Sequence, residues 1–167
     1  MPVQLLHWDG AQWFERGVAA DGDGFGWQDR ATTLRAPPYD FAPGSVVEIH
    51  GQAEAFVRTL AERMHRAAAF FIDYGFPEAE YYHPQRSGGT LMCHRAHRVD
   101  TDPLVDLGLK DITAHVDFTG IALAAQDAGL EVLGYTSQAR FLINCGLPAL
   151  LDGADHRTTV PAQRLIH

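Results

Sequence analysis

The sequence predicts an α/β fold, because helical and strand-like apolar patterns alternate along the chain. Apolar residues recur at helical spacing from Gln52 to Ala67, with charged residues mostly opposite. A continuous apolar run from Ala68 to Asp73 follows and suits a strand covered on both faces. A second helix is expected through Ala128, and Leu130–Tyr135 reads as another strand. Helices that lead into buried strands indicate a layered α/β sheet.

The first part of the chain favours antiparallel strands. Val3–Trp8 and Gln12–Val18 both suit strands, and Asp9-Gly10 between them is a strong hairpin signal because both residues tolerate positive φ. Ala19–Pro43 is rich in Gly, Asp and Pro and is expected to be a surface loop. Ser45–Ile49 is a candidate short strand.

Later segments complete the expected elements, and no linker divides residues 1–167, so one domain is expected. Asp117 or Thr119 can cap the second helix, and Gly129 stops it. The remaining expected elements are two short strands and one short helix that ends at Gly146: Thr90–Arg95, Asp111–His115 and Gln138–Cys145.

Composition excludes several classes of protein. Of the 167 residues, 46% are apolar and 20% charged, which is ordinary for a globular domain. The net charge of −8 opposes binding to nucleic acid or to an acidic membrane surface. Two cysteines cannot make a disulfide framework at this size, and no apolar run reaches the ~20 residues that span a bilayer. No basic and apolar leader is visible, so we expect a cytoplasmic location.

Two motif-like stretches are weak. The glycines of DGDGFG, Asp21–Gly26, match the spacing of a nucleotide loop, but prolines follow where such a loop needs a helix. Cys93, His94, His97 and His115 include metal-ligand types, yet their spacing is not that of a zinc signature, and Cys93 and His94 would face opposite sides of a strand. We therefore expect no metal.

Polar residues near the expected strand ends are candidates for a site. Asp73 ends the apolar run, and ligands of open α/β sheets bind beyond the carboxyl ends of strands. A cap or a salt bridge to Arg86 is the alternative role of Asp73. Asp111, His115 and Asp117 alternate with apolar residues and would share one face of a strand. A solvated face would also explain them, but His94 and His97 nearby favour a pocket wall.

A series of dissimilar motifs resembles one family. IDYGF, YYHPQR, GGTLMCHRAHR, DPL, DITAHVDF and GYTSQARFLINCGL occur in this order. They resemble the C-terminal half of the MidA-like methyltransferases, which use S-adenosylmethionine (SAM) and include the mitochondrial assembly factor for respiratory complex I. The similarity runs from about Phe70 to Leu147, and Val3–Val18 resembles the hairpin of that family.

The resemblance implies the C-terminal part of a Rossmann-like class I methyltransferase fold, with an inserted β-hairpin and irregular loops on the substrate side. The family places its glycine-rich SAM loop and acidic ribose-binding residue upstream of the part that this chain resembles. The SAM-binding half is therefore expected to be missing, the cofactor-binding residues stay unknown, and this chain alone is expected to be inactive. The part of the sheet that remains would have an exposed edge, through which the chain could form homo-oligomers.

The reaction implied by the resemblance is methyl transfer from SAM to a protein arginine. Carboxylates that orient the guanidinium and accept its proton would assist it, and the candidates are Asp73, Asp111 and Asp117. His94, His97 and His115 could relay a proton. Tyr74, Arg86 and Thr90 are expected on the substrate side. The alternative function is a non-catalytic module that grips a protein partner with the Tyr74–Val99 region.

Overall fold

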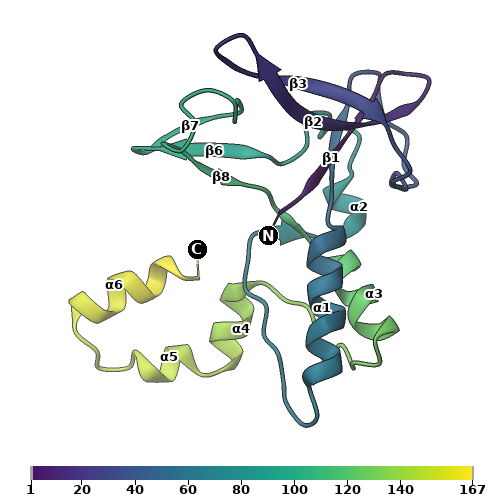
Figure 1. Cartoon of the computed structure of the whole chain (residues 1–167). Coiled ribbons are helices and arrows are strands. Elements are labelled where there is room, and N and C mark those ends of the chain that lie inside the picture. The colour runs from purple at the N-terminus through teal and green to yellow at the C-terminus, as the bar shows by residue number, and fades with distance from the viewer. Residues whose placement is uncertain (1, 167) are drawn as a thin grey trace. The chain divides into compact units, whose positions relative to one another are not determined.

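The computed structural model describes residues 2–166, which form two compact units (Figure 1). The first unit comprises the described residues up to Ala69 together with Asp73–Glu131, and the second comprises Phe70–Ile72 together with the described residues from Val132. The strands are β1 (Gln4–Trp8), β2 (Trp13–Asp21), β3 (Gly24–Ala31), β4 (Val46–Ile49), β5 (Gly75–Phe76), β6 (Met92–Arg95), β7 (Arg98–Asp100), β8 (Asp111–Thr113) and β9 (Val116–Asp117). The helices are α1 (Gly51–Arg63), α2 (Glu78–Tyr81), α3 (Phe118–Asp127), α4 (Gln138–Asn144), α5 (Leu147–Leu150) and α6 (His156–Arg164).

The first unit contains a four-stranded antiparallel sheet in the order β3-β2-β1-β4. The predicted hairpin between its first two strands is confirmed. Gly10 has a φ of 105°, and the Asp9 carboxylate accepts the amides of Ala11 and Gln12 at 2.7 and 2.8 Å. The predicted strand before α1 is confirmed as β4.

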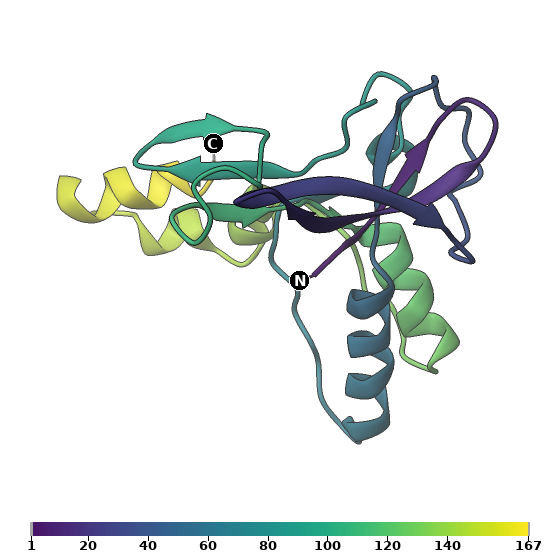
Figure 2. The ribbon, with the colours of Figure 1, turned by 45° about the horizontal axis from the view of Figure 1, so that its top comes forward.

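The prediction of a surface loop over Ala19–Pro43 is wrong for its first part. β2 continues to Asp21, and β3 pairs with it as far as Phe14↔Ala31, so the two strands form the long ribbon seen in Figure 2. The DGDGFG stretch is the turn of this ribbon, with Gly22 at a φ of 57°. Both faces of the ribbon are largely exposed, so the apolar alternation that would have signalled a strand is missing.

The core of the first unit lies where the sheet meets α2. Its buried residues come from β1, β4, α2 and the residue that follows α2: Leu6, Val47, Tyr81 and Tyr82. Partly buried apolar residues surround them: Trp13, Leu34, Ala36, Tyr39, Phe41, Ile49 and Phe76. Two tyrosines at the centre of a core bring hydroxyl groups that need hydrogen-bond partners.

Two helices of the first unit, α1 and α3, lie side by side in both views (Figure 1, Figure 2). Ala53 and Val57 are buried on α1, and Ala124 is buried on α3. The expected helix over Gln52–Ala67 is confirmed, although it ends at Arg63. The second expected helix is confirmed as α3. No helix among the described residues is long and apolar enough to cross a bilayer.

β5 and β9, which precede α2 and α3 in the chain, form a short parallel pair. Gly75 is needed there, because a Cβ at this position would collide with the carbonyl oxygen of Val116 and come within 2.7 Å of the Phe118 ring. Gly75→Ala should therefore lower the free energy of unfolding by about 1–3 kcal/mol, the usual cost of overpacking. Urea unfolding would measure it. Gly88→Ala is the control, since a Cβ there meets nothing within 4 Å; equal losses for both variants would contradict the prediction.

The strands predicted at Ala68–Asp73 and Leu130–Tyr135 are absent, so the prediction is wrong for these segments in the structure. A strand requires a neighbour to accept its backbone hydrogen bonds, and none of the described residues pairs with either segment. Their apolar side chains lie in solvent: Phe70 is 71% exposed, Ile72 72% and Leu133 79%. A mixed α/β fold is confirmed, and its Rossmann-like arrangement stays a prediction.

The second unit is helical from α4 onward. The expected helix is confirmed as α4, and Gly146 follows it at a φ of 93°. The sequence interpretation assigned nothing after Gly146, where the structure forms α5 and α6; the Asp155 side chain caps α6 by accepting the Thr158 amide at 2.9 Å. The side chain of Gln138 also donates to the carbonyl of Leu165 at 2.9 Å, which ties α4 to the end of α6.

Candidate functional site

A buried carboxylate organises the centre of the first unit. Glu48, on β4, is 1% exposed. Its Oε1 accepts the backbone amides of Thr90 and Leu91 at 2.6 and 2.8 Å, and its Oε2 accepts the Tyr81 hydroxyl at 3.0 Å. Three donors around one carboxylate stabilise a charge that would otherwise be costly to bury. Glu48 therefore fixes the backbone where the GGTL segment begins.

Gly89 explains why that segment carries glycine. Its φ is +73°, a left-handed conformation that other residues adopt at a cost. A Cβ at Gly89 would also lie 2.5 Å from Oε1 of Glu48. The backbone can approach the carboxylate only because no side chain stands between them.

The Tyr81 hydroxyl connects the carboxylate to its neighbours. It lies 3.0 Å from Nε2 of His50, 3.0 Å from Oγ1 of Thr90 and 3.2 Å from the carbonyl of His115. Burial raises the pKa of Tyr81 and lowers the pKa of His50 to about 4, so the phenol and the neutral imidazole are the stable forms at pH 7. The cluster of Glu48, His50, Tyr81 and Thr90 is hereafter called the buried polar cluster.

His115 adjoins the buried polar cluster. Its amide donates to Oγ1 of Thr90 at 3.0 Å. Its ring meets Phe76 edge-on with 5.0 Å between centroids, and the Tyr74 ring is 6.4 Å away. Nδ1 of His115 is the one buried side-chain nitrogen or oxygen in residues 2–166 that lacks a hydrogen-bond partner. Such an atom is expected to have a partner in the working protein, so it marks a point where a ligand could bind.

Arg86 lies near the same place but makes no salt bridge with Asp73 among the described residues. Its guanidinium carbon is 4.2 Å from the centroid of the Phe76 ring, a cation–π contact. The carboxylate of Asp73 instead accepts the amide of Tyr74 at 2.8 Å and is exposed. The alternative of an Asp73–Arg86 pair is therefore wrong in this structure.

Asp117 is buried, and its carboxylate caps α3 by accepting the Thr119 amide at 3.0 Å. Burial raises its pKa in spite of these backbone contacts. The Thr119 hydroxyl in turn accepts the amide of Glu78 at 2.9 Å. The cap predicted from sequence is confirmed, and the carboxylate already has a structural role.

Three other predicted residues form a separate group on the sheet β7-β6-β8. His94 and Asp111 are exposed partners across β6 and β8, and His97 lies in the β6–β7 turn at a φ of 62°. The prediction that Asp111, His115 and Asp117 share one strand face is wrong. β8 ends at Thr113 and pairs with β6, whereas β9 pairs with β5, so the chain changes sheets between these residues.

The structure thus joins some predicted residues and separates others. Contacts connect Tyr74, Thr90 and His115, and Arg86 approaches them through Phe76. Cys93 is buried and His94 exposed, which confirms that they face opposite sides of β6. Within residues 2–166 no group of three or more His, Cys, Asp or Glu is arranged to hold a metal ion.

Sequence reasoning missed Glu48, His50 and Tyr81. A signal for the first was present, since a charged residue inside the short apolar run VVEI must find partners when that run becomes a buried strand. Nothing local indicated that the partners would come from a segment 42 residues later.

Comparisons with known proteins give the chain its family. Two solved structures from Burkholderia thailandensis, of one superfamily, are each 47% identical over 99% of this chain. One is an uncharacterised protein with a TM-score of 0.90, and the other is described as a "likely methyl transferase" bound to S-adenosyl-homocysteine, with a TM-score of 0.89. This chain covers 47% and 45% of their respective lengths, so it spans about half of each. No curated protein matches. A family model described as "Putative S-adenosyl-L-methionine-dependent methyltransferase" matches residues 1–136, so the chain belongs to this methyltransferase family.

Proposed function

We propose that this chain is the C-terminal part of an enzyme that transfers a methyl group from SAM to an arginine of a protein. The observation that carries the methyl transfer is the structure of a relative, 47% identical over 99% of this chain, bound to S-adenosyl-homocysteine. That molecule is what remains of SAM after its methyl group has been transferred. The family match supports the same chemistry. The arginine acceptor rests on the resemblance of the motifs to the MidA-like enzymes.

The described residues fit SAM poorly by themselves. Class I sites hold the cofactor on a glycine-rich turn between a parallel strand and a helix. The only glycine-dense stretch, DGDGFG, is a hairpin turn between antiparallel strands. The one parallel pair within residues 2–166, β5 with β9, leads into α3 through the Asp117 cap. We therefore expect SAM to be held by polypeptide outside this chain.

The residues of this chain would serve the acceptor side. A guanidinium stacks on aromatic faces, as Arg86 does on Phe76, and the neighbouring Tyr74 ring is 78% exposed. Nδ1 of His115 would hydrogen-bond an N–H of the acceptor. Thr90 holds the amide of His115 and so positions it. The roles of Asp73, His94, His97, Asp111 and Asp117 stay predictions.

Calorimetry with SAM tests this proposal. The 167-residue chain alone should give no measurable heat. Mixed with the remaining half of the Burkholderia relative, it should bind SAM and transfer a labelled methyl group that is recovered in methylarginine after hydrolysis. Appreciable SAM binding by the chain alone would contradict the proposed division of the site, and label recovered in another residue would contradict the arginine acceptor.

A second candidate function, a protein-binding module, is favoured by the exposed apolar segments 68–73 and 130–135. Unpaired strand-like segments with exposed apolar side chains are ready-made for pairing with another polypeptide. Such pairing could complete the enzyme, join two copies of this chain or bind a different protein. Capture of a partner without any methyl transfer by the completed protein would favour the module.

Self-association through these segments is a testable expectation. The double variant Ile72→Lys, Leu133→Lys should weaken self-association about tenfold or more, because charges replace side chains that would be buried. Sedimentation velocity would measure it. A matched double variant, Val99→Lys with Val105→Lys, changes two other exposed apolar residues and should leave self-association unchanged. Equal weakening by both pairs would show that these segments are not the interface.

A further inference from the structure

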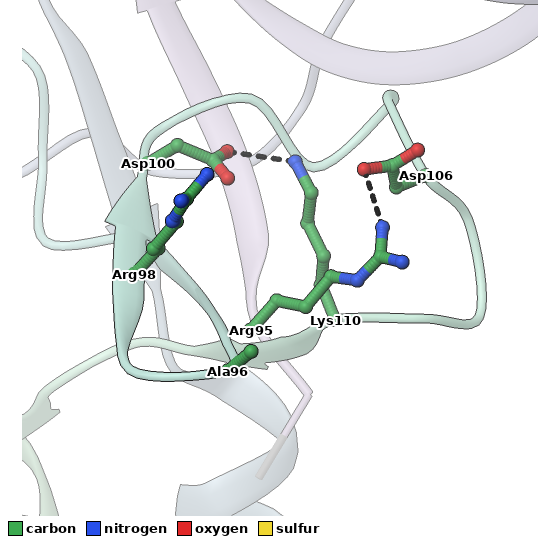
Figure 3. A pocket seen from close by; sticks show the side chains of 6 residues that line it. All are labelled: Arg95, Ala96, Arg98, Asp100, Asp106 and Lys110. Carbon is green, nitrogen blue, oxygen red and sulfur yellow. Dashed lines mark hydrogen bonds and ion pairs between the residues drawn. The ribbon is translucent and has the colours of Figure 1, made fainter.

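The sheet β7-β6-β8 carries a cavity of about 540 Å³ beside the β6–β7 hairpin. Its lining is almost entirely charged and is shown in Figure 3: Arg95, Ala96, Arg98, Asp100, Asp106 and Lys110. Binding pockets for small ligands span about 300–1,000 Å³, so the cavity is large enough for a ligand group. Three of its lining residues, Arg95, Ala96 and Arg98, belong to the CHRAHR motif, and none of the six has a role in the proposed methyl transfer.

The hairpin geometry brings two arginines to the cavity. Ala96 and His97 have φ values of 45° and 62°, which produces a two-residue turn, and Arg95 and Arg98 are cross-strand partners on either side of it. The side chain of Lys110 is only 7% exposed, and its Nζ donates to Oδ1 of Asp100 at 2.8 Å and to the carbonyl of Asp102 at 3.0 Å. These hydrogen bonds hold Lys110 in place in the wall of the cavity.

Charges in the cavity do not balance. Three cations and two carboxylates line it. Arg95 pairs with Asp106 at 2.7 Å, and Lys110 pairs with Asp100. Arg98 makes no ion pair or hydrogen bond through its guanidinium within residues 2–166, and no dashed line joins it to a neighbour in Figure 3. The guanidinium of Arg98 is therefore available to pair with an anion.

We propose that this cavity is a binding site for a carboxylate group, held by the guanidinium of Arg98. A carboxylate fits the two parallel N–H groups of a guanidinium, and its single negative charge balances the uncompensated positive charge of Arg98. A phosphate dianion fits less well, because its second charge would face Asp100 and Asp106 without a free cation. The carboxylate could belong to an acidic side chain of a polypeptide or to a small carboxylic acid. This site does not depend on methyl transfer, since it uses none of the residues assigned to the acceptor.

Titration of the full chain with acetate, followed by backbone amide chemical shifts of residues 95–110, tests the site. Saturable shifts are expected. Arg98→Gln should raise the half-saturating concentration about tenfold, as expected for losing a charge-assisted pair. Arg30→Gln is the matched control, because Arg30 is exposed on β3 and its side chain hydrogen-bonds only to Gln28 within residues 2–166. This variant should leave acetate binding unchanged.

A second variant should strengthen binding. Asp106→Asn removes the partner of Arg95 and thereby frees a second guanidinium, so acetate should bind more tightly. The substitution is mild, because Asp106 has a φ of 54° and asparagine tolerates that conformation well.

The source of the carboxylate is read from a glutamate-containing tripeptide titrated in parallel. A lower half-saturating concentration than for acetate indicates a polypeptide ligand, and equal values indicate a small acid; either supports the carboxylate site. Inorganic phosphate binding more tightly than acetate, unchanged binding in Arg98→Gln, or weaker binding in Asp106→Asn would overturn it.

Discussion

Replacing Glu48 by alanine is expected to lower the free energy of unfolding of the first unit by about 3–5 kcal/mol. The substitution leaves the Thr90 and Leu91 amides without their acceptor and removes one of the acceptors of the Tyr81 hydroxyl. Each buried donor left unsatisfied costs about 1–3 kcal/mol. Urea unfolding followed by tryptophan fluorescence would measure the loss, because Trp8 and Trp13 lie in the same unit.

Tyr82→Phe is the matched control for this prediction. The Tyr82 hydroxyl is also buried, but it donates at 3.0 Å to the backbone carbonyl of Glu48 and leaves the carboxylate untouched. Its loss should cost only about 1 kcal/mol, the usual contribution of one hydrogen bond. The loss of stability in Glu48→Gln should fall between these two values. The glutamine amide keeps one oxygen acceptor, but its NH₂ group would face donors that the carboxylate accepts. If Glu48→Ala cost no more than Tyr82→Phe, the carboxylate would not be the centre of the cluster.

The helices α1, α3 and α4 were predictable from this sequence because their signals are local. Asp117 caps α3, and Gly129 ends it at a φ of 83°, where its amide bonds to the carbonyl of Gln126 at 2.9 Å. Gly146 marks the end of α4 in the same way. Spacing of apolar residues and a residue that tolerates positive φ both act within a few positions, so the sequence alone contains them.

Several strand assignments were wrong, because strand pairing is not local. Residues 68–73 have the composition of a buried strand, yet the described residues offer no neighbour and the segment stays unpaired. Conversely, β3 pairs along eight residues although its sequence reads as a glycine-rich loop. Whether a segment forms a strand depends on whether another strand lies beside it. Composition indicates only that the segment is suitable for pairing.

The predicted site residues remain predictions, and the sequence did not indicate how they would be arranged. His115, Thr90 and Tyr74 were identified from their motifs, and the structure brings them together. The buried polar cluster that holds them was missed, because its bonds join Tyr81 and Glu48, 33 residues apart, and His50 and Tyr81, 31 residues apart. The role of a polar residue in a core can be assigned only when its hydrogen-bond partners are known.

His50 should make the first unit unstable in mild acid. Its pKa in the folded chain is about 4, against 6.5 for an exposed imidazole, because burial disfavours the charged form. Between these values the unfolded chain binds more protons than the folded chain, so stability is full above pH 7 and falls as the pH drops towards 4. Each unit of pKa difference is worth 1.36 kcal/mol, which predicts a loss of about 3 kcal/mol over this range.

The variant His50→Gln isolates this effect. Glutamine keeps an N–H that can reach the Tyr81 hydroxyl but does not titrate, so its stability should change less between pH 7 and pH 4. Asp117 works in the opposite direction, since its raised pKa relieves the burial of its charge as the pH falls, but it is present in both proteins and cancels in the difference. Urea unfolding at several pH values would give both curves. Parallel curves for the two proteins would mean that His50 is not the group whose protonation unfolds the unit.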